Sequence, residues 1–130
     1  MANPDLAEIL NRVRQPFNVN SYGLAAAGAA LSDDAFVEAS LRVNESGMRQ
    51  LVSVAERTGL SFIPSRGNFL TIQFEQPGAE VYTKLLQQGI IVRPLGGYGL
   101  PNHLRVSVGR EAENERFCLG LESIMSNVAT

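Results

Sequence analysis

The stretch IIVRPLGGYGLPNHLRVSVG, residues 90–109, decides the fold, because it holds two alternating apolar segments around a glycine- and proline-rich loop. In residues 103–108 every second side chain is leucine or valine, so Arg105 lies on the opposite face of a strand. Residues 90–95 alternate in the same way, which places Arg93 away from the apolar face. If the two strands pair antiparallel, both guanidinium groups point to the face of the sheet that carries no helix.

Two interpretations of this arginine pair are open at this point. Guanidinium groups are planar forks that bind carboxylates and phosphates through two parallel hydrogen bonds, so Arg93 and Arg105 together suit an anionic ligand. Arginines on an open sheet face are also commonly solvated or paired with nearby glutamates, and they then have only a structural role. Spacing alone does not decide between the two.

Composition excludes several other classes of protein. The chain has 130 residues, which suits one domain, and a net charge of −2, which gives no electrostatic reason to expect a nucleic acid as partner. The single cysteine, Cys118, excludes an internal disulfide. With only one histidine, His103, the sequence also predicts no cysteine- or histidine-based metal site. Lys84 is the only lysine, so chemistry that needs a lysine nucleophile depends on it or on residues outside this chain.

The most apolar segment is YGLAAAGAAL, residues 22–31. It is too short to span a bilayer, so we expect a buried helix there, no membrane partner and a cytoplasmic protein.

Hydrophobic periodicity predicts an α+β fold. Apolar residues recur at helical spacing in some segments and alternate in others. The expected helices are residues 4–14, 22–31, 32–59, 78–88 and 110–128. The expected strands are residues 60–65, 68–74, 90–95 and 103–108. A two-layer α/β sandwich, with a small mixed or antiparallel sheet and helices on one face, buries these stripes most simply.

Four segments carry a resemblance to a known family. They are RQPFNVNS at 14–21, RGNFLTIQF at 66–74, GIIVRPL at 89–95 and LRVSVGREAENERF at 104–117. In this order the sequence resembles histidinol-phosphate aminotransferases, which are pyridoxal-phosphate enzymes of fold type I in the class I/II group. The resemblance implies that residues 1–20 are the end of an interdomain helix and its connection, and that residues 21–130 are the C-terminal small domain.

The same resemblance implies a substrate-binding role for three residues. Arg105 corresponds to the arginine that binds the substrate α-carboxylate, Arg93 to one that contributes to holding the phosphate of histidinol phosphate, and Asn68 to a substrate-facing position. The implied reaction transfers an amino group between glutamate and imidazole acetol phosphate, in histidine biosynthesis. The implied partners are an anionic amino acid or phosphate ester, the large domain of a longer parent, and a second subunit.

The resemblance places the catalytic chemistry outside this chain. The family's cofactor-bearing lysine and the groups that hold pyridoxal phosphate are expected upstream of residue 1, and Lys84 has no matching motif around it. We therefore expect no catalytic, cofactor-binding or metal-binding residue here. The chain is expected to be a piece of a longer enzyme, inactive on its own.

Rival hypotheses remain at this stage. The parent is alternatively another class I/II aminotransferase or a threonine-phosphate decarboxylase, or the chain is a stand-alone ligand-binding or interaction module. Among single residues, His103 is expected at the surface and Cys118 in the packed interior. Tyr98 either edges the substrate site or is an ordinary aromatic residue of a turn.

Overall fold

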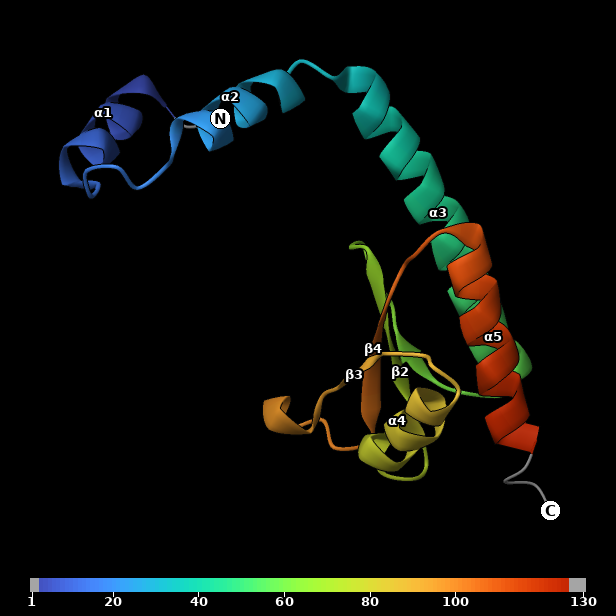
Figure 1. The fold of residues 1–130 in the computed structure, drawn as a ribbon. Coiled ribbons are helices and arrows are strands. Elements are labelled where there is room, and N and C mark those ends of the chain that lie inside the picture. Colours follow the sequence, from blue (N-terminus) through green and yellow to red (C-terminus); the bar gives the residue numbers. More distant parts are fainter. Residues whose placement is uncertain (1–2, 127–130) are drawn as a thin grey trace. The chain divides into compact units, whose positions relative to one another are not determined.

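The computed structural model describes residues 3–126 and divides the chain into two compact units, Met1–Val37 and Glu38–Thr130. The boundary falls inside a long helix, α3 (Figure 1). The elements, in chain order, are α1 (Pro4–Val13), α2 (Ser21–Ala30), α3 (Asp34–Arg57), β1 (Phe62–Ile63), β2 (Phe69–Gln73), α4 (Gly78–Gln87), β3 (Arg93–Pro94), the 3₁₀ helix η1 (Gly96–Tyr98), β4 (His103–Ser107) and α5 (Glu111–Ser126).

The described residues of the N-terminal unit form two capped helices and the start of α3, and none of them is buried. The side chain of Asn3 accepts a hydrogen bond from the backbone N–H of Asp5, and that of Asn20 accepts one from Gly23, so both helices begin at an asparagine cap. Neither α1 nor α2 contains a buried residue. The sequence prediction of a helix at 22–31 is therefore confirmed, but its predicted burial is wrong, because apolar composition does not supply a surface to pack against.

The two halves of helix α3 differ in burial. It begins after Asp33, whose carboxylate accepts a hydrogen bond from the N–H of Phe36 at 3.0 Å. Leu41, in its first half, is 56% exposed, whereas Leu51 and Val54, in its second half, are fully buried. The apolar stripe predicted along the whole helix thus packs only over its C-terminal half.

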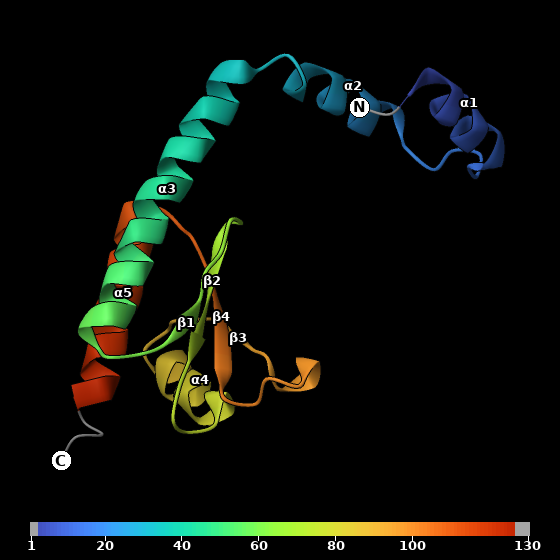
Figure 2. The same cartoon turned by 180° about the vertical axis from the view of Figure 1, so that it is seen from behind.

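Within residues 3–126 the sheet has four strands in the order β1-β2-β4-β3, and each neighbouring pair is antiparallel (Figure 2). The antiparallel form of the predicted sheet is confirmed. Strand β3 is much shorter than the segment 90–95 that the alternation predicts. Pro94 has no N–H to continue the ladder, and the N–H of Ile90 donates to Leu85 at the end of α4 instead.

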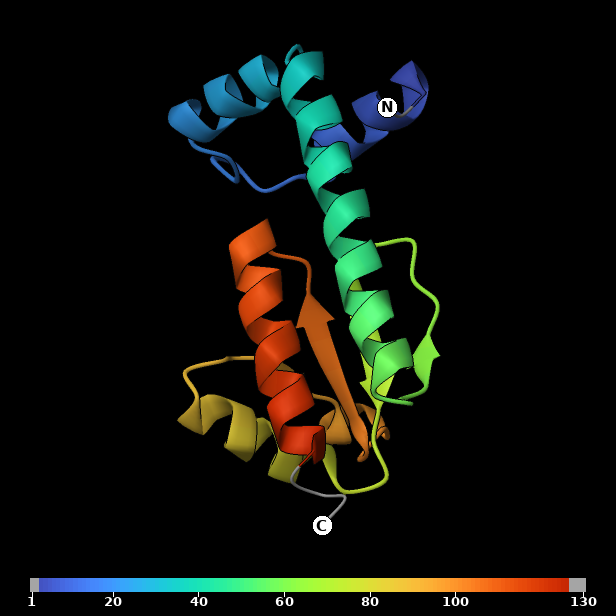
Figure 3. The ribbon, with the colours of Figure 1, turned by 90° about the vertical axis from the view of Figure 1, so that its right-hand side faces the viewer.

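Within residues 38–126, helices α3, α4 and α5 cover the same face of the sheet, which confirms the predicted fold class. Helices α3 and α5 lie side by side over it (Figure 3), and α4 packs beside them. The alternate residues of β2 and β4 point into one shared core with the helices. The largest fully buried side chains there are Leu51, Leu70, Ile72, Leu85, Leu104 and Leu121.

The junction between β4 and α5 is held by one buried amide. Asn114, only 3% exposed, accepts a hydrogen bond from the N–H of Gly109 at 2.8 Å and donates to the Gly109 carbonyl at 3.0 Å. The same amide donates to Gln50 on α3 at 3.0 Å. The strand that carries Arg105 is thereby tied to both α3 and α5.

None of the described helices has the length and apolar character that crossing a membrane requires.

Candidate anion-binding site

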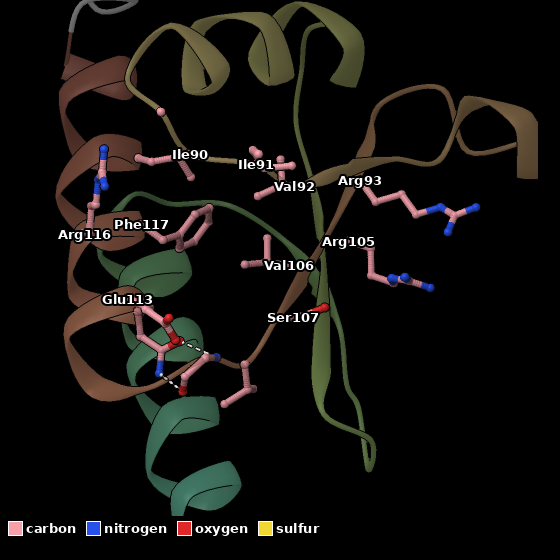
Figure 4. A pocket seen from close by; sticks show the side chains of 14 residues that line it. Ile90, Ile91, Val92, Arg93, Arg105, Val106, Ser107, Glu113, Arg116 and Phe117 are labelled. Atoms are coloured by element: carbon pink, nitrogen blue, oxygen red, sulfur yellow. Dashed lines mark hydrogen bonds between the residues drawn. The ribbon is translucent and has the colours of Figure 1, made fainter. Parts of the chain in front are cut away.

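Arg93 and Arg105 lie directly opposite each other, on β3 and β4. Directly opposed residues of an antiparallel pair point to the same face, with Cβ atoms about 5 Å apart. Figure 4 shows both side chains leaving the sheet in one direction, away from α5. Because the even-numbered neighbours Leu104 and Val106 are buried under the helices, this direction is the helix-free face. It is the arrangement that the alternation predicts.

Each guanidinium lies against an aromatic ring. Nη2 of Arg93 donates a hydrogen bond to the phenol oxygen of Tyr98 at 2.9 Å, and its Cζ lies 5.5 Å from the centroid of that ring. The Cζ of Arg105 lies 5.3 Å from the ring centroid of Phe69. Distances of this size suit a cation–π interaction, which orients a guanidinium and leaves most of its N–H groups available.

Neither arginine forms an ion pair with another residue of the part of the chain that the structure describes. The salt bridges found there join Arg12 to Glu8, Arg42 to Glu38 and Arg57 to Glu122. The interpretation in which Arg93 and Arg105 are neutralised by neighbouring glutamates is therefore wrong for residues 3–126. Two adjacent positive charges without a carboxylate partner favour an anion from outside.

A cavity of about 490 Å³ lies beside the pair, between β4, the segment 89–93 and α5 (Figure 4). Two other charged residues line it, and both have partners within the fold. Glu113 accepts a hydrogen bond from the N–H of Arg110 at 2.7 Å, and Arg116 donates to the carbonyl of Gln88 at 2.9 Å. Arg93 and Arg105 contribute to the lining, but their guanidinium groups point away from this cavity to the helix-free face (Figure 4), so that face is where the pair is available to an anionic ligand.

The structure does not bring Asn68 into this cavity. Asn68 is exposed and precedes β2, and its carbonyl accepts a hydrogen bond from the N–H of Val108 at 2.8 Å. Its backbone therefore helps to fix the end of β4, one residue beyond the pair that Phe69 makes with Ser107. His103, which was expected at the surface, is half-buried, and its Nδ1 has no hydrogen-bond partner within the described residues.

Sequence reasoning undervalued the two aromatic contacts. The sequence leaves Tyr98 open between an edge of the substrate site and an ordinary turn aromatic, and it does not indicate a role for Phe69. Two features of the sequence could have indicated these contacts. Tyr98 follows Arg93 by five residues across two glycines, and Phe69 lies on the odd-numbered face of its strand.

The comparisons with known proteins agree with this fold. The family model described as aminotransferase class I and II matches residues 1–121. The chain belongs to the aminotransferase class I and II family.

Within that family, the sequence is similar to histidinol-phosphate aminotransferases. The chain is 51% identical over 126 residues to histidinol-phosphate aminotransferase 1 of Mannheimia succiniciproducens, which covers 97% of this chain and 34% of the relative. The resemblance to histidinol-phosphate aminotransferases inferred from the motifs is thereby confirmed. The chain spans about a third of the length of the curated relatives that it matches.

Solved structures show the same fold. The crystal structure of the histidinol-phosphate aminotransferase from Clostridium acetobutylicum matches with a TM-score of 0.85 at 22% identity, over 96% of this chain and 39% of that one. The enzyme from Sinorhizobium meliloti, solved in complex with pyridoxal-5'-phosphate, matches with a TM-score of 0.82 at 23% identity, over 96% of this chain and 35% of that one. The described part of the chain thus has the fold of an aminotransferase C-terminal region.

The residues of this chain do not by themselves fit the cofactor of these enzymes. A lysine that forms a Schiff base needs a lowered pKa and a cofactor within reach. The only lysine, Lys84, is exposed on α4 and does not line the cavity beside the arginine pair. Lys84 is therefore not placed to form a Schiff base with pyridoxal phosphate.

Proposed function

We propose that this chain supplies substrate recognition to a pyridoxal-phosphate-dependent histidinol-phosphate aminotransferase. In this proposal Arg105 binds the α-carboxylate of the amino-acid substrate, and Arg93 contributes to binding the phosphate of histidinol phosphate. Asn68 lies at the substrate-facing end of the same domain. The cofactor, which the remainder of the enzyme would hold, supplies the amino-transfer chemistry between glutamate and imidazole acetol phosphate.

One observation carries the proposal: two unneutralised arginines lie directly opposite each other on the open face of the sheet. Each presents a planar fork of N–H donors to the same region, and each is steadied by an aromatic ring. A substrate with two anionic groups, or a carboxylate beside a phosphate, matches this arrangement better than a neutral one.

The exposed apolar residues of α1 and α2 support a second part of the proposal, in which the chain works within a larger assembly. Leu6, Ile9 and Leu24 are more than half exposed. Such surface is typical of an interface, so we assign it to the large domain of the longer enzyme and to a second subunit.

The test uses a chimera in which these 130 residues replace the corresponding third of the Mannheimia succiniciproducens enzyme. We expect Arg105→Ala to lower kcat/KM for glutamate by about 30- to 1,000-fold, equivalent to about 2 to 4 kcal/mol of lost transition-state binding. Steady-state kinetics with glutamate and histidinol phosphate measure this change.

The matched control is Arg42→Ala, which removes an exposed arginine paired with Glu38 on α3, outside the cavity. We expect it to leave kcat/KM within about twofold of the unmodified chimera, as for most surface substitutions. An Arg105→Ala chimera with unchanged kcat/KM for glutamate would refute the carboxylate assignment.

A further inference from the structure

Tyr98 makes two contacts with Arg93 that no other described residue makes. Its phenol oxygen accepts a hydrogen bond from Nη2 of Arg93 at 2.9 Å, and its ring centroid lies 5.5 Å from the guanidinium carbon. Arginine has a long, flexible side chain, and β3, which carries Arg93, is only two residues long. The orientation of this guanidinium therefore depends on what touches its far end.

The backbone of Tyr98 is well placed to give that support, although its side chain is 65% exposed. Leu95, which is buried, donates its N–H to the carbonyl of His103 at 3.1 Å and so closes the loop at its base. The carbonyl of Leu95 then accepts hydrogen bonds from Tyr98 at 2.9 Å and from Leu100 at 3.2 Å. Gly99, with φ of +76°, provides the left-handed residue that ends the 3₁₀ turn.

The two arginines are supported differently. Arg105 lies over the ring of Phe69, which has no hydrogen-bond acceptor, whereas Arg93 has both a ring and an oxygen from one residue. The phenol oxygen engages one of the five N–H groups of Arg93, which leaves the others for a ligand. The hydrogen bond and the ring contact together restrict the orientation of the plane in which the remaining donors lie.

We propose that Tyr98 is a positioning residue, which orients the Arg93 guanidinium for binding the anionic group of the substrate. This inference rests on the proposed function for the role of Arg93, and goes beyond it by naming the residue that sets the geometry of that arginine.

The first measurement is made on the 130-residue chain itself, by ¹⁵N NMR of the arginine side chains. In the unmodified chain we expect slow rotation of the Arg93 guanidinium. In Tyr98→Phe, which keeps the ring and removes only the oxygen, we expect this rotation to become faster. The signals of Arg105 serve as an internal control and stay unchanged. Equal rotation of Arg93 in the two proteins would overturn the proposal.

The second measurement is kinetic and uses the chimera with the Mannheimia succiniciproducens enzyme. We expect Tyr98→Phe to raise KM for histidinol phosphate by about 2- to 10-fold with little change in kcat, the range for one lost hydrogen bond. Tyr82→Phe is the matched control. It removes a phenol oxygen from α4, away from the cavity, and should leave KM unchanged.

A double-mutant cycle separates positioning from a general structural role. When Arg93 is already replaced by alanine, we expect Tyr98→Phe to change KM by less than twofold, because its effect passes through Arg93. The same increase in KM in both backgrounds would overturn the proposal. If Arg93→Ala leaves KM unchanged while NMR shows that Tyr98→Phe frees Arg93, the phosphate role in the proposed function fails, although the contact itself is real.

Discussion

Cys118 lies on α5 where that helix faces α3, and the residue is 9% exposed. Its Sγ lies 3.8 Å from the carbonyl oxygen of Gln50. Burial raises the pKa of the thiol above the ordinary value of 9.0; Arg57 opposes this shift and Glu122 adds to it. The thiol therefore stays protonated at neutral pH, and the predicted packing role of Cys118 in the interior is confirmed.

The raised pKa has a consequence for stability at alkaline pH. The folded chain retains the thiol proton at pH values where the unfolded chain loses it, so the unfolded state binds fewer protons. This contribution to stability is complete below pH 9 and is lost as pH rises through the folded-state pKa. We expect the free energy of unfolding to fall more steeply above pH 9 in the unmodified chain than in Cys118→Ala. Urea denaturation between pH 7 and pH 10.5 measures both slopes, and parallel slopes would contradict the assignment.

At the scale of single residues, the sequence predicted orientation better than contact. Alternation was sufficient to place Arg93 and Arg105 on one face of the sheet, because that prediction requires only that both segments are strands whose other face is buried. The hydrogen bond from Arg93 to Tyr98 depends on the exact turn at 96–98, which composition does not specify. Asn114 was not identified as a buried residue, because a single amide inside a helical pattern gives no periodic signal.

At the scale of elements, Gly47 marks the closest approach of α3 to the β4–α5 junction. A Cβ atom at this position would overlap the side chain of Val108 and lie 2.6 Å from Nδ2 of Asn114. Glycine is an unfavourable residue inside a helix, so its presence in the middle of α3 needs a packing reason. The close approach supplies that reason.

We expect Gly47→Ala to lower the free energy of unfolding by about 1 to 3 kcal/mol, as overpacked sites do, despite the better helix propensity of alanine. The matched variant is Gly28→Ala in α2, where an added Cβ meets no atom within 4 Å. That change should raise helicity slightly and leave the main denaturation midpoint unchanged. Circular dichroism during chemical denaturation measures both, and an unchanged midpoint in Gly47→Ala would contradict the packing argument.

Element types were predictable from the sequence, whereas element lengths were less so. Helices α3, α4 and α5 and strands β2 and β4 follow directly from periods of 3.6 and 2. Strand β3 shrank to Arg93–Pro94, because the hydrogen-bond partner of Ile90 is in α4 rather than in the sheet. The partner of a backbone N–H is a tertiary property, and local pattern does not contain it.

At the scale of the whole molecule, stability and apolar surface are unevenly distributed. Among the described residues of the unit Met1–Val37, none is buried, while the core belongs to the unit Glu38–Thr130. Sequence periodicity identified apolar stripes in both units. Periodicity did not distinguish an apolar stripe that packs against other residues of this chain from an apolar stripe that stays exposed.

We therefore expect a chain that begins at Glu38 to keep the free energy of unfolding within about 0.5 kcal/mol of the full chain, since the deletion removes no buried side chain. We also expect it to associate less at high concentration, because exposed apolar residues such as Phe17 and Leu31 are gone. Chemical denaturation and sedimentation velocity measure the two effects. A loss of more than about 2 kcal/mol would mean that residues 1–37 support the core.

The hydrogen bond from Leu95 to His103 seals the loop that separates the two arginines. Insertions or deletions between Leu95 and His103 would leave Arg93 and Arg105 opposite each other, because the strand register that pairs the two arginines is set outside this loop. Evolution can therefore lengthen or shorten this segment to suit a differently shaped substrate while the two cations keep opposed positions on the strands, whereas a change that removes Tyr98 also removes the hydrogen bond to Arg93.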